Sequence, residues 1–271
     1  MRACGNPRRG VALKARALAR REIVRFSGRV AVVTGAGSGI GQATSVLLAD
    51  EGAVVVGSDI NAAGLEKTTA MVDEGSVFQP VESDVRSRDA CHDLVASVVA
   101  DHGRLDVLCN IAGVARGHRV GEVDQEVWDL IFGVNVEGVF WMSQAALPHL
   151  ESSNGCIVNM ASNAGLMGQA YTVPYCASKG AVIQITKAMA METMKAGVRI
   201  NAIAPGGVET NLAASFGFPD GPDMELMGRY MGMRGMAQAD DIASAVAYLA
   251  SDEAHRIHGA VLSIDAGLTA G

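Results

Sequence analysis

The feature of this 271-residue sequence that most constrains its fold is a regular alternation of short apolar runs with longer amphipathic stretches. The runs are rich in Val, Ile and Ala, which is typical of strands buried on both faces. The stretches between them are long enough to form helices that cover a sheet. We expect strands at 30–33, 53–58, 77–81, 107–110, 156–160, 198–204 and 261–265, and helices at 39–50, 65–72, 89–100, 125–150, 174–195 and 240–249.

This alternation predicts βαβ units, because parallel neighbouring strands need a crossover connection and a helix usually supplies it. Right-handed crossovers place the helices on both faces of the sheet. With 49% of its residues hydrophobic, the chain can bury a sizeable core. The expected fold class is therefore α/β, with about seven strands in one doubly wound parallel sheet and one domain.

Residues 1–25 lie outside this pattern and differ from the rest in charge. They contain eight Lys or Arg residues and a single acid, Glu22, whereas the remainder of the chain is strongly acidic. We expect a basic, disordered N-terminal extension followed by one domain at 26–271. A targeting segment or a contact with an anionic surface would also suit such a composition.

Composition also bounds the partners and the compartment. A net charge of −7 argues against nucleic acid as the main partner, and the lack of a run of about 18 apolar residues argues against a membrane span. Scattered cysteines without metal-site spacing indicate reduced thiols, a cytoplasmic location and no metal. The cysteines are Cys4, Cys91, Cys109, Cys156 and Cys176.

A glycine-rich turn, Thr34–Gly41, joins the first expected strand to the first expected helix and has the sequence TGAGSGIG. Its glycines permit a tight turn and let the backbone approach a pyrophosphate closely. The helix N-terminus adds free N–H donors and a favourable dipole. This context predicts a dinucleotide site.

Asp59 ends the second expected strand, and no Lys or Arg lies between Thr34 and Asp59. A carboxylate at this place accepts hydrogen bonds from the adenosine ribose and repels a 2′-phosphate. The sequence therefore predicts NAD as the cofactor. The alternative is a turn or cap aspartate before Asn61.

Tyr175 and Lys179 lie one turn apart on one face of an expected helix. To act near neutral pH, the tyrosine must lower its pKa from about 10 by about 3 units, or about 4 kcal/mol. A neighbouring ammonium and the positive charge of an oxidised nicotinamide both act in that direction. Ser162, after a buried strand, could hydrogen-bond a substrate oxygen, or it could be an ordinary turn serine.

With these motifs, the chain resembles the short-chain dehydrogenase/reductase superfamily in its single-domain, Rossmann-type form. The resemblance extends from about Ser27 to Gly267. Thr34–Gly41 fits the TGxxxGxG turn and Tyr175 to Lys179 fits YxxxK. Further matching segments are Asp84-Val85, Asn110-Ile111-Ala112-Gly113 (with Ile111 in place of a second Asn), Asn135, Pro205–Thr210 and Gly259–Gly267.

The resemblance implies a site and a mechanism. Tyr175 would be the acid/base, Lys179 would lower its pKa and bind the nicotinamide ribose, and Ser162 would hold the substrate oxygen. Asn135 would hold a water that connects Lys179 to solvent, and hydride transfer would be direct. The residues implied for the cofactor are Gly35, Ser38, Gly39, Ile40, Gly41, Asp59, Ile60, Asp84, Val85, Asn110, Ala112, Gly113, Tyr175, Lys179, Pro205, Gly206, Val208 and Thr210.

The expected function is NAD(H)-dependent interconversion of a secondary alcohol and a ketone. A 3-ketoacyl-thioester reductase is the alternative, and a non-catalytic NAD(H)-sensing protein on the same fold is a further one. The resemblance also implies a homotetramer (or a homodimer), with the helices at 125–150 and 174–195 at the interfaces. Val182, Ile185 and Met189 are spaced for such a face, although core burial would explain them equally well.

Residues 211–235 interrupt the alternation and predict a lid over the reacting carbon. The segment is rich in Met and aromatic residues, which suit irregular apolar ligands. We therefore expect a hydrophobic substrate that is alicyclic, aromatic or steroid-like; the other reading is that the Met side chains pack on the protein itself. The residues concerned are Phe216, Phe218, Tyr230, Met224, Met227, Met231 and Met233, with Leu166 and Met167 beyond Ser162 on the same wall.

Overall fold

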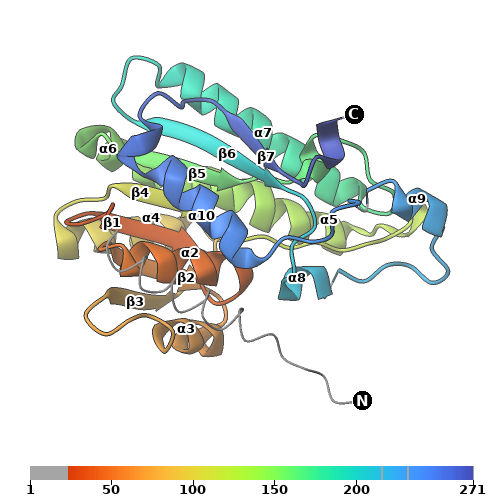
Figure 1. Cartoon of the computed structure of the whole chain (residues 1–271), viewed down its shortest axis with the longest axis horizontal. Helices are drawn as coiled ribbons and strands as arrows, with labels where there is room; N and C mark the ends of the chain where they lie inside the picture. The colour runs from red at the N-terminus through yellow and green to blue at the C-terminus, as the bar shows by residue number, and fades with distance from the viewer. Residues whose placement is uncertain (1–23, 215, 231, 271) are drawn as a thin grey trace.

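The computed structural model describes residues 24–214, 216–230 and 232–270. In this part of the chain, seven strands form one parallel sheet in the order β3-β2-β1-β4-β5-β6-β7 (Figure 1). The predicted fold class, a doubly wound parallel sheet in one domain, is confirmed. The strands are β1 (Val30–Thr34), β2 (Val54–Asp59), β3 (Val77–Glu82), β4 (Val107–Asn110), β5 (Cys156–Met160), β6 (Arg199–Pro205) and β7 (Val261–Ile264).

Helices cover both faces of the sheet, and α2 and α10 lie side by side on one of them (Figure 1). The alternation along β1 explains the two layers, since Ala31 and Val33 pack on the α2 and α10 side while Val30 and Val32 pack on the α4 and α6 side. The helices are α2 (Gly39–Asp50), α3 (Ala62–Thr69), α4 (Arg88–His102), α5 (Gln125–Phe132), α6 (Gly138–Ser153), α7 (Val173–Glu192), α8 (Asn211–Ala214), α9 (Met224–Gly228) and α10 (Ala239–Ala250).

The strand order reverses between β1 and β4. From β1 the chain proceeds to β2 and β3 on one side, and from β4 it proceeds to β5, β6 and β7 on the other. The loops that follow β1 and β4 therefore diverge and leave a crevice at the carboxyl ends of the strands. In open α/β sheets this is where ligands bind.

The predicted helix at 125–150 has an interruption. Between α5 and α6, residues Gly133–Glu137 form a π-helical turn, and Asn135 is buried within it. Such turns are rare and often occur at functional sites. The whole segment, Gln125–Ser153, is long and apolar enough to cross a membrane by length and composition, which the sequence analysis did not expect; half of its apolar window is buried inside the fold, as in a core helix.

Only the last two residues of the predicted extension, 1–25, lie within the described residues, and residues 1–23 lie outside them. Arg25 Nε lies 2.6 Å from Oε2 of Glu51, a carboxylate that is only 3% exposed. A buried carboxylate needs a partner, and this ion pair joins Arg25 to the body of the fold. The boundary between extension and domain at 26 stays a prediction.

Candidate active site

A cavity of about 470 Å³ lies at the carboxyl ends of the strands. Its walls come from the loops that follow β1, β2, β4, β5 and β6, and from the segment around α8 and α9. The volume lies in the range of small-molecule and cofactor sites. One end of the cavity is formed by the glycine-rich turn, and the other end by Tyr175 and its surroundings.

The glycine-rich turn is packed too closely for side chains. Gly35 has φ +72°, and a Cβ there would lie 2.8 Å from Cα of Ala112. A Cβ at Gly41 would overlap the carbonyl oxygen of Gly35. Since α2 begins at Gly39 with no acid in its first turn, its free N–H groups and its dipole favour an anion at this end.

Asp59 borders the same end of the cavity and anchors the turn. Its Oδ2 accepts a 2.9 Å hydrogen bond from the backbone N of Gly37, and its Oδ1 accepts one of 2.9 Å from the backbone N of Asn61. The N-cap of α3 is Asn61, whose side chain accepts from Gly64. Asp59 is thus not the N-cap of α3, although its bond to the backbone N of Asn61 is the turn of the alternative interpretation, and its side chain lies on the cavity wall.

The residues of this end fit a dinucleotide. Ser58 Oγ lines the cavity, is buried, and has no hydrogen-bond partner among the described residues. A buried polar atom of this kind needs a partner, which a bound ribose or base can supply. Beside it, the Arg86 side chain holds the pKa of Asp84 below its usual range through a hydrogen bond, so that carboxylate is ionised.

Two of the predicted site residues lie behind the cavity wall rather than on it. Asn110 Nδ2 donates to Ser143 Oγ at 3.0 Å and to Asn159 Oδ1 at 2.8 Å, inside the core. Asn135 has bonds of 2.8 and 2.9 Å to the backbone N–H and carbonyl of Val114. Among the predicted cofactor residues, those on the wall are Gly35, Ser38, Gly39, Ile40, Gly41, Asp59, Ile60, Asp84, Val85, Ala112, Gly113, Tyr175, Lys179, Pro205, Gly206, Val208 and Thr210.

Ser162, Tyr175 and Lys179 meet at the other end of the cavity. Ser162 follows β5, and the two others share one face of α7, with Lys179 Nζ 5.8 Å from the centre of the Tyr175 ring. Lys179 is buried and donates a 2.8 Å hydrogen bond to the carbonyl of Met160. Asn135 reaches this group through Ser178, whose hydroxyl accepts from Asn135 Nδ2 at 3.0 Å.

Burial sets the protonation of this group. It lowers the pKa of Lys179 to about 8, because the charged ammonium is removed from water. Burial also raises the pKa of Tyr175, and a hydrogen bond with Ser162 partly offsets that rise. Near neutral pH, Tyr175 therefore holds its proton and can act as an acid, while Lys179 remains largely an ammonium.

The apolar wall of this end comes in part from the predicted lid, through its aromatic residues rather than its described methionines. Its side chains are Val114, Leu212, Phe216 and Tyr230, and the Phe216 ring packs edge-on against Tyr175 with centres 5.9 Å apart. Backbone bonds from Gly117 to Phe216 and a 3.1 Å bond from Tyr230 Oη to Ala170 hold this segment in place.

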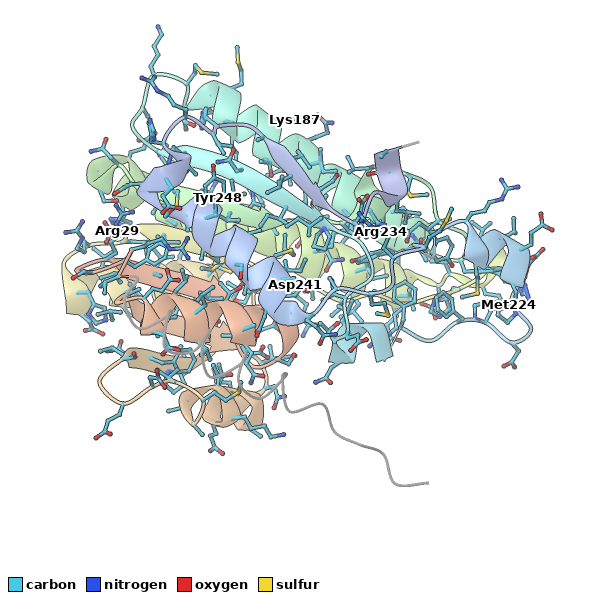
Figure 2. All side chains as sticks on the ribbon, in the orientation of Figure 1. Arg29, Lys187, Met224, Arg234, Asp241 and Tyr248 are labelled. Carbon is cyan, nitrogen blue, oxygen red and sulfur yellow. The ribbon has the colours of Figure 1, made fainter. Side chains whose placement is uncertain are left out.

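The described methionines of the predicted lid, Met224, Met227 and Met233, do not line the cavity. Met227 is buried and Met233 is fully exposed, while Met231 lies outside the described residues. Figure 2 shows Met224 at the outer edge of the molecule, on α9, and its side chain is 62% exposed. Leu166 and Met167 are not on the wall either. Aromatic side chains from the same segment, Phe216 and Tyr230, line the cavity instead.

Asn163 and Gln169 line the cavity, and the sequence analysis did not predict either as a site residue. Both follow β5, in the loop before α7. Their positions relative to Ser162 follow neither a helical nor a strand periodicity, because they lie in the loop between β5 and α7. A polar residue next to Ser162 was the available signal for Asn163.

Comparison with known proteins agrees with the fold. A family model described as enoyl-(acyl carrier protein) reductase matches residues 35–269. The chain belongs to the short-chain dehydrogenase/reductase superfamily of oxidoreductases.

Particular relatives cover nearly all of the chain. It is 38% identical to meso-2,3-butanediol dehydrogenase of Serratia marcescens over 91% of this chain and 97% of the relative. The crystal structure of levodione reductase superimposes with a TM-score of 0.83 at 30% identity, covering 91% and 100% of the two chains. For 3-ketoacyl-(acyl-carrier-protein) reductase from Brucella melitensis complexed with NADH, the TM-score is 0.80 at 31% identity, with 90% and 99% covered.

Proposed function

We propose that this protein is an NAD(H)-dependent oxidoreductase that interconverts a secondary alcohol and a ketone on a substrate with an apolar body. One observation carries the proposal: a single cavity has the glycine-rich turn with Asp59 at one end and Ser162, Tyr175 and Lys179 at the other. A bound nicotinamide cofactor supplies the hydride chemistry.

The side chains supply binding and proton transfer. Ser162 Oγ hydrogen-bonds the substrate oxygen, and Tyr175 Oη gives that oxygen a proton in reduction or takes one in oxidation. Lys179, as an ammonium, favours the deprotonated form of Tyr175. Asn135 braces the loop at Val114 and, through Ser178, the first turns of α7, so that Tyr175 and Lys179 stay in register.

The preference for NAD over NADP rests on Asp59. Its carboxylate is fixed by the backbone N–H groups of Gly37 and Asn61, and so cannot easily move aside for a 2′-phosphate. Each oxygen still has a lone pair for a ribose hydroxyl. Lys67 is exposed on α3 and borders a separate hollow behind the turn. Arg86, a base on the wall of the cavity, is paired with Asp84.

The apolar body of the substrate is inferred from Val114, Leu212, Phe216 and Tyr230. An aromatic ring packed edge-on against Tyr175 leaves a flat surface suited to an alicyclic or aromatic group. The kinship with acyl-carrier-protein reductases supports a second candidate, a 3-ketoacyl-thioester reductase. Such an enzyme needs a basic surface for its carrier, whereas the lid carries both signs of charge.

We also propose a homotetramer. Trp128 and Phe140, on α5 and α6, expose large apolar surface at 39% each, which suits a subunit contact. Val182 and Met189 on α7 pack in the core instead. Gel filtration with light scattering would test the assembly, and elution as a monomer would contradict it.

The experiment that tests the function is a substrate panel with the purified protein. A cyclic apolar alcohol, a polyol and a 3-ketoacyl thioester are each assayed with NAD(H) and NADP(H). We expect the highest kcat/KM for the cyclic alcohol with NAD⁺. A tenfold preference for the polyol would overturn the apolar body, preference for the thioester would favour the second candidate, and no turnover at all would indicate a non-catalytic protein.

A further inference from the structure

The structure places a second hydrogen-bonding side chain, Gln169, near Ser162. We propose that Gln169 binds a second oxygen of the substrate, next to the reacting one, so that the preferred substrates are apolar vicinal diols, hydroxyketones or diketones. This inference rests on the proposed function, and names its substrate class more closely. The second oxygen is bound through hydrogen bonds and is neither oxidised nor reduced.

Asn163 connects Ser162 and Gln169. Its side-chain Oδ1 accepts a 3.2 Å hydrogen bond from Ser162 Oγ and a 3.1 Å hydrogen bond from Gln169 Nε2. Because the two donors share one acceptor, they lie within two hydrogen-bond lengths of each other. Asn163 is only 4% exposed and belongs to the short turn after β5, so the arrangement is built into the fold.

Gln169 has hydrogen-bonding capacity left for a ligand. An amide carries two N–H donors and a carbonyl oxygen with two lone pairs, and the bond to Asn163 uses one donor. The side chain lines the cavity and is partly exposed to it. Its fixed donor orients the amide, so the remaining groups point in a defined direction rather than sampling many.

The apolar side chains of the cavity make the Gln169 amide important for the choice of substrate. The same cavity wall holds the apolar or aromatic side chains of Val114, Leu212 and Phe216, and the Tyr230 hydroxyl is bonded to the carbonyl of Ala170. A polar group in an apolar wall is costly when it has no partner. A substrate that offers an oxygen at this place is therefore favoured over one that offers only carbon.

The spacing selects the position of that oxygen. Once its single O–H turns from Asn163 to the substrate, Ser162 donates from a point within two hydrogen-bond lengths of the second N–H of Gln169. Oxygens on adjacent carbons of one molecule lie a few ångströms apart, so such a pair can satisfy both donors at normal hydrogen-bond lengths.

The test compares cyclohexanol with cyclohexane-1,2-diol, using the intact protein and NAD⁺. We expect kcat/KM for the diol to exceed that for cyclohexanol by about tenfold or more. In the variant Gln169→Met, which keeps the length of the side chain but not its amide, the diol should lose about tenfold while cyclohexanol changes by less than about threefold. Because both alcohols are assayed on one preparation, the ratio does not depend on the fraction of folded protein.

A matched control is Gln79→Met, on the edge strand β3, where the exposed Gln79 contacts His102 at 3.0 Å far from the cavity. It should leave the diol preference unchanged. Equal losses for both alcohols in Gln169→Met would show a merely structural role and overturn the inference alone. Turnover of neither alcohol by the wild type would overturn the proposed function and this inference with it.

Discussion

Lys179 Nζ donates a 2.8 Å hydrogen bond to the carbonyl oxygen of Met160, and this bond joins α7 to the end of β5. Lys179 lies one turn from Tyr175 on α7. Burial of its ammonium lowers the pKa of Lys179 to about 8. A site that serves chemistry in this way is costly for the fold, and the cost can be measured.

The cost predicts that Lys179→Met stabilises the protein while removing its activity. A fall of the pKa from 10.5 in the unfolded chain to about 8 in the folded one disfavours folding by about 3 kcal/mol at pH 7. Leaving the Met160 carbonyl without its partner takes back about 1–2 kcal/mol. A net gain of about 1 kcal/mol should therefore appear as a higher Tm.

The pH dependence of that gain has a definite sign. Below pH 8 the unfolded chain binds its proton more tightly than the folded one, and the penalty is full. As pH rises from about 8 to 10.5 the penalty disappears, so the advantage of the variant should vanish and then reverse, because the cost of the unpartnered Met160 carbonyl remains. Thermal unfolding of both at pH 7 and pH 10 checks this, and a variant that is less stable at pH 7 would contradict it.

Tyr175→Phe should remove nearly all turnover and leave NADH binding within a few-fold. The substitution deletes the hydroxyl that transfers the proton and keeps the ring that packs against Phe216. Steady-state rates and NADH fluorescence titration measure the two effects separately. A variant that keeps a tenth of the wild-type rate would rule out Tyr175 as the acid/base.

Asp59→Ala should weaken the use of NAD⁺ by about tenfold or more, since hydrogen bonds to a charged group contribute about 1.5–3 kcal/mol. It should also relieve the rejection of NADP⁺. Asp59→Asn is the matched variant, because its amide oxygen can still accept from Gly37 while the negative charge is gone. Values of kcat/KM for both cofactors decide the matter, and a wild type that already prefers NADP⁺ would refute this role of Asp59.

The fold and the cofactor end could be predicted because local patterns determine them. A buried strand such as β1 needs apolar residues on both faces, and the close approach of Gly35 to Ala112 leaves room for no side chain, so both leave clear marks in the sequence. The substrate end depends on how a long segment folds back over the sheet. For that reason the composition of residues 211–235 predicted an apolar lid but not that Phe216 and Tyr230, rather than the described methionines, would line the cavity, and Gln169 was missed.

The last prediction concerns where the chain can be shortened. Glu51 is almost fully buried, and Arg25 is bonded to it through Nε at 2.6 Å and Nη2 at 2.8 Å. Leaving a buried carboxylate without its partner costs up to about 3–5 kcal/mol, and the new N-terminal ammonium of a chain beginning at Phe26 can replace only part of the bidentate contact.

We expect a chain that begins at Val24 to keep the Tm and the activity of the full-length protein. A chain that begins at Phe26 should melt several degrees lower, at about 2–4 °C per kcal/mol for a domain of this size. The variant Arg25→Met in the full-length protein separates loss of the ion pair from loss of residues 1–24, and should reproduce the lower Tm. Equal melting temperatures for all of these proteins would show that the pair contributes nothing and that the domain begins at Phe26.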